Sequence, residues 1–304
     1  MSELIIPEPH RIVDIRSDDG AIVRFRQHGN LDGPRLMVSH GNGFAADGYF
    51  GFWRHLMDDY EIIAHDLRNH GANPLHGPEN HNYETFVADY HQAMGQLPDI
   101  LGAKPTAGLY HSASALTALH YVPVGGFVWD ALVLFDPPIM PADGHPLNPQ
   151  SVEFEGMMAD WAAKRPERFA SPDQIANGFR KTKSLSGWED GIYDILARAI
   201  LKPDGDEWVL ACPAAMESAL YRSQIGSDLW QKLPAAAAHA DKIIILASDN
   251  DVPGAKPPAR VLPAVAEEFG FPIQIVPGTT HLLQMEEPAQ VAELTRAFLK
   301  NRGL

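Results

Sequence analysis

The sequence predicts an α/β fold with a mostly parallel, doubly wound sheet, and three observations lead to it. Short apolar runs without polar alternation recur along the chain, which is typical of strands covered on both faces of a parallel sheet. Segments with apolar residues at helical spacing separate these runs, as in residues 83–97. Residues 11–16 and 21–27 alternate around a turn at 17–20, which predicts an antiparallel hairpin before the parallel strands.

The order of elements predicts a core with one insertion. Buried strands are expected at residues 35–39, 61–64, 131–135, 241–247 and 271–276, and just before Ser112. From Ile139 to Pro234 the alternation of strand and helix stops, and short helical stripes take its place. We therefore expect residues 1–138 and 235–304 to form the core and residues 139–234 to form a helical cap. A closing helix is expected from Pro288.

Composition excludes several classes of partner. The formal net charge of −15 argues against nucleic acid or an anionic membrane as a partner. The single cysteine, Cys212, excludes an internal disulfide and a cysteine-rich metal site. The first ten residues lack the features of a signal peptide, and no apolar stretch has the length of a membrane span. These observations favour a cytoplasmic protein.

Ser112 stands where a strand turns directly into a helix. The residues before it are apolar and follow the breakers Lys104-Pro105, whereas Ala and Leu at helical spacing follow it. Such a turn exposes a hydroxyl group above the strand end, beside the backbone N–H groups of the new helix. The alternative is that Ser112 only caps the helix.

Two further strand ends carry the groups that a nucleophilic serine needs. An acid at Asp249 or Asp251 follows one buried strand, and His281 follows the last one. Nucleophilic hydrolysis requires a hydroxyl group, an imidazole to take its proton and a carboxylate to orient that imidazole. Because parallel strands end at the same edge of a sheet, we expect these side chains to converge there.

In these motifs the chain resembles the α/β-hydrolase family with a helical cap, over nearly its whole length. The residues that carry the resemblance are His40-Gly41-Asn42-Gly43, Asp66-Leu67-Arg68-Asn69-His70-Gly71, His111-Ser112, Asp251 and Gly278-Thr279-Thr280-His281. The resemblance implies a serine hydrolase without a cofactor. It also implies an oxyanion hole formed by the backbone N–H groups of Asn42 and Ala113, with Gly43 or Phe44 as alternatives for the first of these.

Two features depart from the family pattern or leave a choice. Tyr110 stands two residues before the serine, where a small residue is usual, so either the site makes room for its ring or the turn is more open. Asp251 is preferred over Asp249 because it lies at the usual spacing after Ser248. Ser114 is the less favoured alternative nucleophile.

The predicted activity is hydrolysis of small hydrophobic carboxylic esters or lactones through an acyl-enzyme. Serine at position 112 argues against epoxide hydrolase and haloalkane dehalogenase, whose chemistry needs a carboxylate nucleophile. The alternatives are hydrolysis of a C–C bond in a ring-cleavage product and a slow-turnover ligand sensor. The expected substrate-binding residues are Gly43, Phe44, His111, Met157 and Trp161.

The many histidines do not by themselves predict a metal site. His65, His70, His76 and His81 lie close together in the sequence without a carboxylate-rich set of partners. We expect structural roles for them and no metal.

Overall fold

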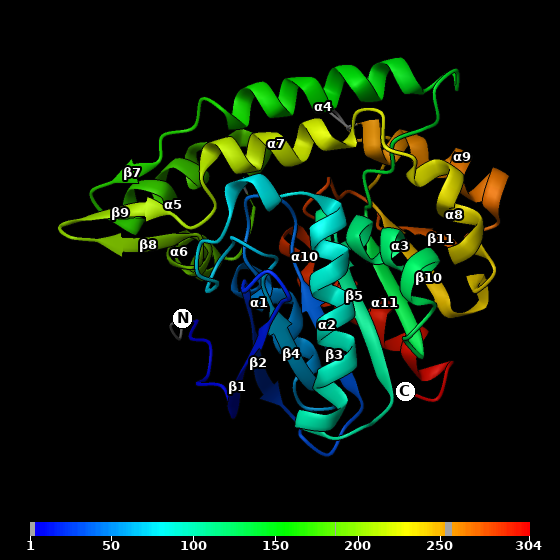
Figure 1. Ribbon diagram of the computed structural model, residues 1–304, viewed down its shortest axis with the longest axis horizontal. Helices are drawn as coiled ribbons and strands as arrows, with labels where there is room; N and C mark the ends of the chain where they lie inside the picture. The colour runs from blue at the N-terminus through cyan, green and yellow to red at the C-terminus, as the bar shows by residue number, and fades with distance from the viewer. Residues whose placement is uncertain (1–3, 186, 253–256) are drawn as a thin grey trace.

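The computed structural model describes residues 4–185, 187–252 and 257–304, and its centre is an eight-stranded sheet (Figure 1). The strand order is β1-β2-β4-β3-β5-β6-β10-β11. The β1/β2 and β2/β4 pairs are antiparallel, whereas the other neighbouring strands are parallel. The predicted mostly parallel sheet with an antiparallel start is confirmed. Its strands are β1 (Arg11–Arg16), β2 (Ile22–Gly29), β3 (Arg35–Ser39), β4 (Glu61–His65), β5 (Thr106–His111), β6 (Ala131–Phe135), β10 (Ile243–Ala247) and β11 (Ile273–Ile275).

Helices cover both faces of this sheet, as the uninterrupted apolar strands predict. One face packs against α2 (Tyr83–Leu101), α3 (Ala113–Gly125), α8 (Leu229–Ala237) and α9 (Pro257–Phe269). The other packs against α1 (Phe50–Trp53), α6 (Asp190–Ala199), α10 (Leu283–Glu286) and α11 (Pro288–Lys300). The side chains of β3 show the division, because Met37 joins the first core while Leu36 and Val38 join the second.

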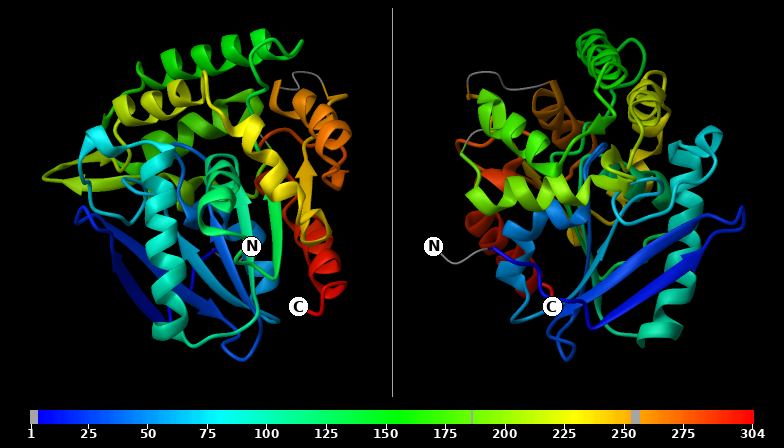
Figure 2. Two further views of the ribbon diagram at one scale, coloured as in Figure 1. Left: turned by 45° about the vertical axis from the view of Figure 1, so that its right-hand side comes forward. Right: turned by 90° about the vertical axis from the view of Figure 1, so that its left-hand side faces the viewer.

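Between β6 and β10 the chain forms a separate group of elements over one end of the sheet. Helices α4 (Asn148–Ala162) and α7 (Ala214–Gln224) pack side by side, and the right-hand view of Figure 2 shows both almost end-on above the sheet. Helix α5 (Pro172–Lys181) and a small antiparallel sheet, in the order β7-β9-β8, complete the group. The small sheet comprises β7 (Arg168–Phe169), β8 (Leu201–Asp204) and β9 (Glu207–Leu210).

The small sheet was not expected in a segment predicted to be helical. Its strands have two to four residues, and β8 contains Pro203 and charged side chains. Such short, polar strands lack the apolar run by which a strand is identified in a sequence.

Short 3-10 turns complete the described fold: η1 (Ala46–Tyr49), η2 (Arg54–Leu56), η3 (Pro78–Asn80), η4 (Lys183–Leu185) and η5 (Ala240–Lys242). Local chemistry sets the helix ends. For example, the side chain of Asn82 accepts a hydrogen bond from the backbone N–H of Thr85 and caps α2. None of the described helices combines the length and apolarity needed to cross a bilayer.

Candidate active site

Ser112 lies in the sharp turn between β5 and α3, as the sequence predicts. Its φ of 52° and ψ of −113° are rare for a residue with a side chain. The hydroxyl group of Ser114 stabilises the turn, because it accepts from the His111 N–H and donates to the His111 carbonyl. Ser114 is fully buried and committed to these two bonds, whereas Ser112 is 8% exposed and its hydroxyl group lies beside the His281 ring.

Tyr110 fits beside this turn because Gly108 provides the space. A Cβ atom at Gly108 would lie 2.4 Å from the Tyr110 ring. The two residues share one face of β5, since side chains alternate along a strand. The Tyr110 hydroxyl accepts a hydrogen bond from the Trp129 indole at 3.2 Å. The large residue is therefore accommodated by the smallest one two positions earlier.

Ser112, His281 and Asp136 form a continuous relay. Nε2 of His281 lies 3.1 Å from Oγ of Ser112, and Nδ1 of His281 lies 2.6 Å from Oδ2 of Asp136. The structure thus brings together the predicted serine and histidine. The carboxylate that meets the histidine differs from the predicted one, Asp251.

Asp136 is held at the end of β6 by the end of the neighbouring strand β10. Its Oδ1 accepts hydrogen bonds from both the N–H and the hydroxyl group of Ser248, each at 2.9 Å. Its backbone has a φ of 42°. Burial by itself raises the pKa of Asp136. The hydrogen bond and charge of His281 and the hydrogen bonds from Ser248 lower it by more, so the pKa of Asp136 lies below its ordinary value. The carboxylate is ionised at neutral pH.

Asp251 lies away from this relay, which corrects the predicted pairing with His281. Its side chain is exposed, and its N–H donates to the Asp249 carboxylate, which also accepts from the Gly278 N–H. Both acids therefore belong to the surface of the loop after β10. The physical reason is that β6 and β10 are adjacent parallel strands, so an acid after either strand is near His281. Like Asp251, Asp136 is a carboxylate close after a buried strand, so the sequence pattern fits both residues.

In the loop after β3, most backbone N–H groups near Asn42 already have an acceptor. The Gly43 N–H donates to Nε2 of His70 at 3.1 Å, and the Phe44 N–H donates to the Gly41 carbonyl. The Gly41 N–H donates to a tyrosine hydroxyl. The Asn42 N–H, between the engaged N–H groups of Gly41 and Gly43, has no such acceptor. Gly43 and Phe44, the two alternatives for an oxyanion donor, are thus already engaged.

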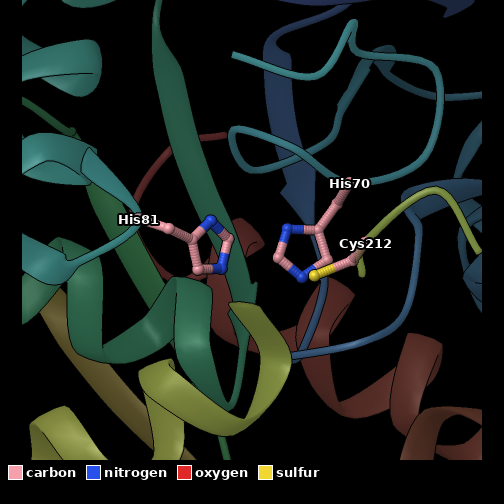
Figure 3. A group of neighbouring side chains, drawn as sticks. All are labelled: His70, His81 and Cys212. Carbon is pink, nitrogen blue, oxygen red and sulfur yellow. The ribbon is translucent and has the colours of Figure 1, made fainter. Parts of the chain in front are cut away.

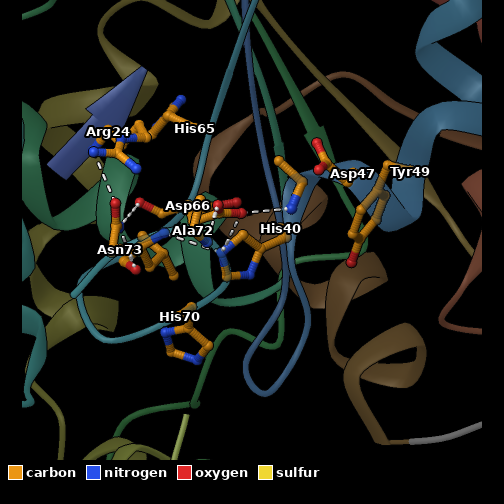
Figure 4. A network of polar contacts seen from close by, with 12 residues as sticks. Arg24, His40, Asp47, Tyr49, His65, Asp66, His70, Ala72 and Asn73 are labelled. Atoms are coloured by element: carbon orange, nitrogen blue, oxygen red, sulfur yellow. Dashed lines mark hydrogen bonds and ion pairs between the residues drawn. The ribbon is translucent and has the colours of Figure 1, made fainter. Parts of the chain in front are cut away.

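The buried carboxylate of Asp66 holds the loop after β3 through hydrogen bonds (Figure 4). Asp66 accepts hydrogen bonds from Arg26 at 2.9 Å and from the Ala46 N–H at 2.7 Å. Next to it, His40 accepts from the Leu67 N–H and donates to the Gly41 carbonyl at 2.7 Å. His40 therefore holds the loop rather than facing a substrate.

Three of the predicted substrate-binding side chains are exposed to solvent or already engaged by protein groups. Met157 and Trp161, on α4, are 54% and 55% exposed, and the Arg165 guanidinium lies 5.4 Å from the centre of the Trp161 ring. His111 is buried, and both of its ring nitrogens have protein partners. Gly43 lies at the site but its N–H is occupied, while Phe44 is half-buried against the ring of Tyr49.

Two charged residues that were not predicted from the sequence lie against the loop after β3. Glu217, on α7, is buried and pairs with Arg165. Its carboxylate lies so close to Gly43 that a Cβ atom there would be 2.7 Å from it, and its backbone carbonyl accepts from the Asn42 side chain at 2.9 Å. Burial raises the pKa of Glu217 although Arg165 opposes this effect. Nothing in the local sequence distinguishes these two residues from surface charges.

His70, His81 and Cys212 lie together beside the loop, with one potential ligand atom of each within 4.8 Å of the others (Figure 3). Zinc accepts such a set of ligands, but it needs their lone pairs. Nε2 of His70 accepts from the Gly43 N–H, and Nδ1 of His81 faces the Asn69 amide nitrogen at 3.3 Å. Burial raises the pKa of the Cys212 thiol well above its ordinary value. The bonds of His70 and His81 connect this group to Gly43 and Asn69, whereas Nε2 of His81 has no hydrogen-bond partner in the described part of the chain.

Comparison with known proteins gives a family and many similar folds. Residues 36–294 match the model of a family described as "Alpha/beta hydrolase family". A search of curated proteins found no match.

Several solved structures share the fold at low sequence identity. An E-2-(acetamidomethylene)succinate hydrolase has a TM-score of 0.74 and 15% identity, with 95% of this chain and 100% of that chain covered. An α/β hydrolase from Novosphingobium aromaticivorans has a TM-score of 0.71 and 16% identity, with coverage of 97% and 100%. An esterase from Exiguobacterium antarcticum has a TM-score of 0.70 and 15% identity, with coverage of 95% and 99%. At this identity the likeness shows the fold alone.

Proposed function

Because the chain belongs to the alpha/beta hydrolase family, we propose that it hydrolyses carboxylic esters or lactones through an acyl-enzyme on Ser112. The observation that carries this proposal is the relay from Ser112 through His281 to Asp136, at 3.1 and 2.6 Å. These are hydrogen-bond distances for a nucleophile, its general base and the acid that orients the base.

In the first step Oγ of Ser112 attacks the carbonyl carbon while Nε2 of His281 takes the hydroxyl proton. Asp136, ionised and hydrogen-bonded to Nδ1, stabilises the imidazolium that forms. The backbone N–H groups of Asn42 and Ala113 stabilise the oxyanion. Ala113 is the first residue of α3, where a backbone N–H has no partner within the helix.

When the tetrahedral intermediate collapses, His281 returns the proton to the leaving alkoxide and the acyl group stays on Ser112. Water then attacks the acyl carbonyl while His281 takes its proton, and the same imidazolium protonates Oγ of Ser112 as the acid product leaves. The proton of Ser112 leaves with the alcohol and is replaced by one from water, so the cycle consumes only water and the ester.

We also propose that residues 139–234 act as a cap over this site. The hydrogen bond from the Asn42 side chain to Glu217 supports this role, because it joins the segment to the oxyanion loop. The cap groups at this contact are the charged Glu217 and Arg165 rather than Met157 or Trp161. A substrate screen should therefore contain polar as well as alkyl acyl groups.

A fluorophosphonate reagent combined with ester turnover tests the proposal. We expect labelling at Ser112, steady-state hydrolysis of short p-nitrophenyl esters, and loss of both in Ser112→Ala. Label on another residue would contradict the assignment. Turnover of a C–C ring-cleavage substrate without ester turnover would show that the protein is a C–C bond hydrolase and not an esterase. A burst of product without steady-state turnover would indicate a ligand sensor.

A pair of matched variants identifies the acid. Asp136→Asn should lower kcat by about 10⁴, as loss of the orienting carboxylate does in a serine triad. Asp251→Asn makes the same chemical change on the surface and should keep most of the activity. The opposite order of the two variants would return the role to Asp251.

A further inference from the structure

Tyr49 connects the oxyanion loop to the residue that precedes the nucleophile. Its hydroxyl oxygen accepts from the Gly41 N–H at 3.1 Å and lies 2.7 Å from Nδ1 of His111. The other nitrogen of this ring, Nε2, lies 2.8 Å from the backbone carbonyl of His281. Four groups from four separate segments thus form one chain of hydrogen bonds.

The direction of every bond in this chain is determined. A carbonyl oxygen only accepts, so Nε2 of His111 must carry the proton that it donates to His281. Nδ1 of the neutral ring is then an acceptor, and the Tyr49 hydroxyl group donates to it. The same oxygen uses a lone pair to accept from Gly41. Each donor and each acceptor is used once.

Burial keeps the side chains of Tyr49 and His111 uncharged near neutral pH. Tyr49 and His111 are each 1% exposed. Burial, helped by the nearby charge of His281, lowers the pKa of His111 to about 3, and burial raises the pKa of Tyr49. Both side chains are therefore neutral at pH 7.

We propose that Tyr49 and His111 are positioning residues that fix the oxyanion loop and the backbone of His281 relative to each other. The proposal rests on the proposed function of Ser112 and His281. Neither side chain hydrogen-bonds to Oγ of Ser112 or to the ring nitrogens of His281, although the His111 ring packs against the His281 ring with centroids 4.7 Å apart. Gly41 lies next to the proposed donor Asn42, and a Cβ atom at Gly41 would be 3.1 Å from Nδ1 of His111 and from Cβ of Ser112. A shift of either end of the chain would therefore change the distances at the nucleophile.

The test is a double-mutant cycle with Tyr49→Phe and His111→Leu in the full chain. Tyr49→Phe keeps the ring and removes only the hydroxyl group, and we expect kcat to fall about 10- to 100-fold because two buried groups lose their partner. KM should change less than about threefold, since no substrate contact is removed. The double variant should be no slower than His111→Leu alone, because the two residues act as one unit.

Tyr193→Phe is the matched control. The Tyr193 hydroxyl group also makes two hydrogen bonds, from the Trp188 N–H at 3.3 Å and to the Leu185 carbonyl at 2.7 Å, away from the site. Its loss should lower Tm without changing kcat per labelled serine. Unchanged kcat in Tyr49→Phe, an effect confined to KM, or additive losses in the cycle would overturn the proposal.

The rate of fluorophosphonate labelling separates this proposal from the proposed function. Labelling needs the nucleophile and its base but no ester turnover. If the wild-type protein hydrolyses no ester, the proposed function fails, and the labelling rate of Tyr49→Phe still tests the positioning. We expect that rate to fall with the same factor as kcat, and an unchanged rate would refute the positioning role.

Discussion

Gly108 shows how a single residue makes the serine turn possible. The site has a tyrosine two residues before the nucleophile only because the residue below it on β5 lacks a side chain. The sequence raised this question without answering it, since Tyr110 stood out while Gly108 looked like any glycine in a buried strand.

We expect Gly108→Ala to destabilise the fold by about 1–3 kcal/mol, because the new Cβ atom would overlap the Tyr110 ring in a closely packed core. Urea unfolding measures the change. Tyr110→Leu in the same background should recover part of the loss by vacating that space. Gly95→Ala is the control, since nothing lies within 4 Å of its new Cβ atom and alanine favours a helix. Equal effects of the two glycine variants would contradict the steric account.

At the same scale, the serine and histidine of the relay could be predicted and its acid could not. Ser112 follows a strand and is favoured over its only nearby rival, Ser114, and His281 follows the last strand without another histidine beside it. Asp136 and Asp251 follow neighbouring strands of one sheet. The pattern of the sequence places both at the same edge, but which loop turns its carboxylate inward depends on packing that only the structure provides.

Helix α4 shows where reasoning from apolar periodicity fails for a whole element. Its buried face consists of Ser151, Glu155, Ala159 and Ala162, while Met157 and Trp161 are exposed. Small residues let α4 approach α7 closely. The periodicity rule looks for large apolar side chains and therefore selects the wrong face of such a helix.

Glu155 makes the packing of α4 sensitive to pH. It is 4% exposed, and burial raises its pKa to about 8. Between the ordinary value of 4.5 and about 8, the unfolded chain releases this proton while the folded one retains it. Stability from this residue is therefore complete below pH 4.5 and is lost as the pH rises through about 8.

We expect Glu155→Gln to raise the free energy of unfolding by roughly 2–4 kcal/mol at pH 8 and by much less at pH 5. Glutamine keeps the shape and cannot ionise in the unfolded state. Glu153→Gln changes an exposed position on the same helix and should have little effect at either pH. A gain that is the same at both pH values would show that ionisation of Glu155 is not its cause.

For the molecule as a whole, Asp66 joins segments that lie far apart in the sequence. Its carboxylate links β2 through Arg26, the start of η1 through Ala46 and its own loop through Ala72, at 2.7–3.0 Å. Burial opposes its ionisation, but Arg26, His40 and these N–H groups outweigh burial and lower its pKa. Its contribution to stability is complete above the ordinary value of 3.8 and is lost as the pH falls further.

Asp66→Asn should lower the free energy of unfolding at pH 7 by about 3–5 kcal/mol, because the buried Arg26 loses one of its two carboxylate partners and keeps only Asp47. The loss should shrink as the pH is lowered below 3.8, where the wild-type carboxylate is also neutralised. Asp228→Asn removes an exposed pair with Lys232 and should cost less than about 1 kcal/mol. Similar losses in both variants would rule out a special role for the buried network.

At this scale most of the architecture could be predicted, because the apolar pattern of each strand and each amphipathic helix indicates which of its faces are buried. The β8–β9 hairpin could not, since its side chains are those of a surface loop. The contact of Glu217 with Gly43 could not either, because residues that meet only in the folded chain leave no local pattern.

The adjacency of β6 and β10 has a consequence for genetics. Ser248 touches the Asp136 carboxylate with both its N–H and its hydroxyl group, each at 2.9 Å, so a carboxylate at 248 would lie beside the side chain at 136. A selection for restored hydrolysis in an Asp136→Asn strain should therefore return Ser248→Asp as an intragenic suppressor, recovering at least tenfold of the lost kcat. Revertants that map to residue 251 instead would show that the loop after β10 supplies the replacement. Such a suppressor would show that two codons far apart in the gene, whose residues are neighbours in the fold, can each encode the catalytic carboxylate.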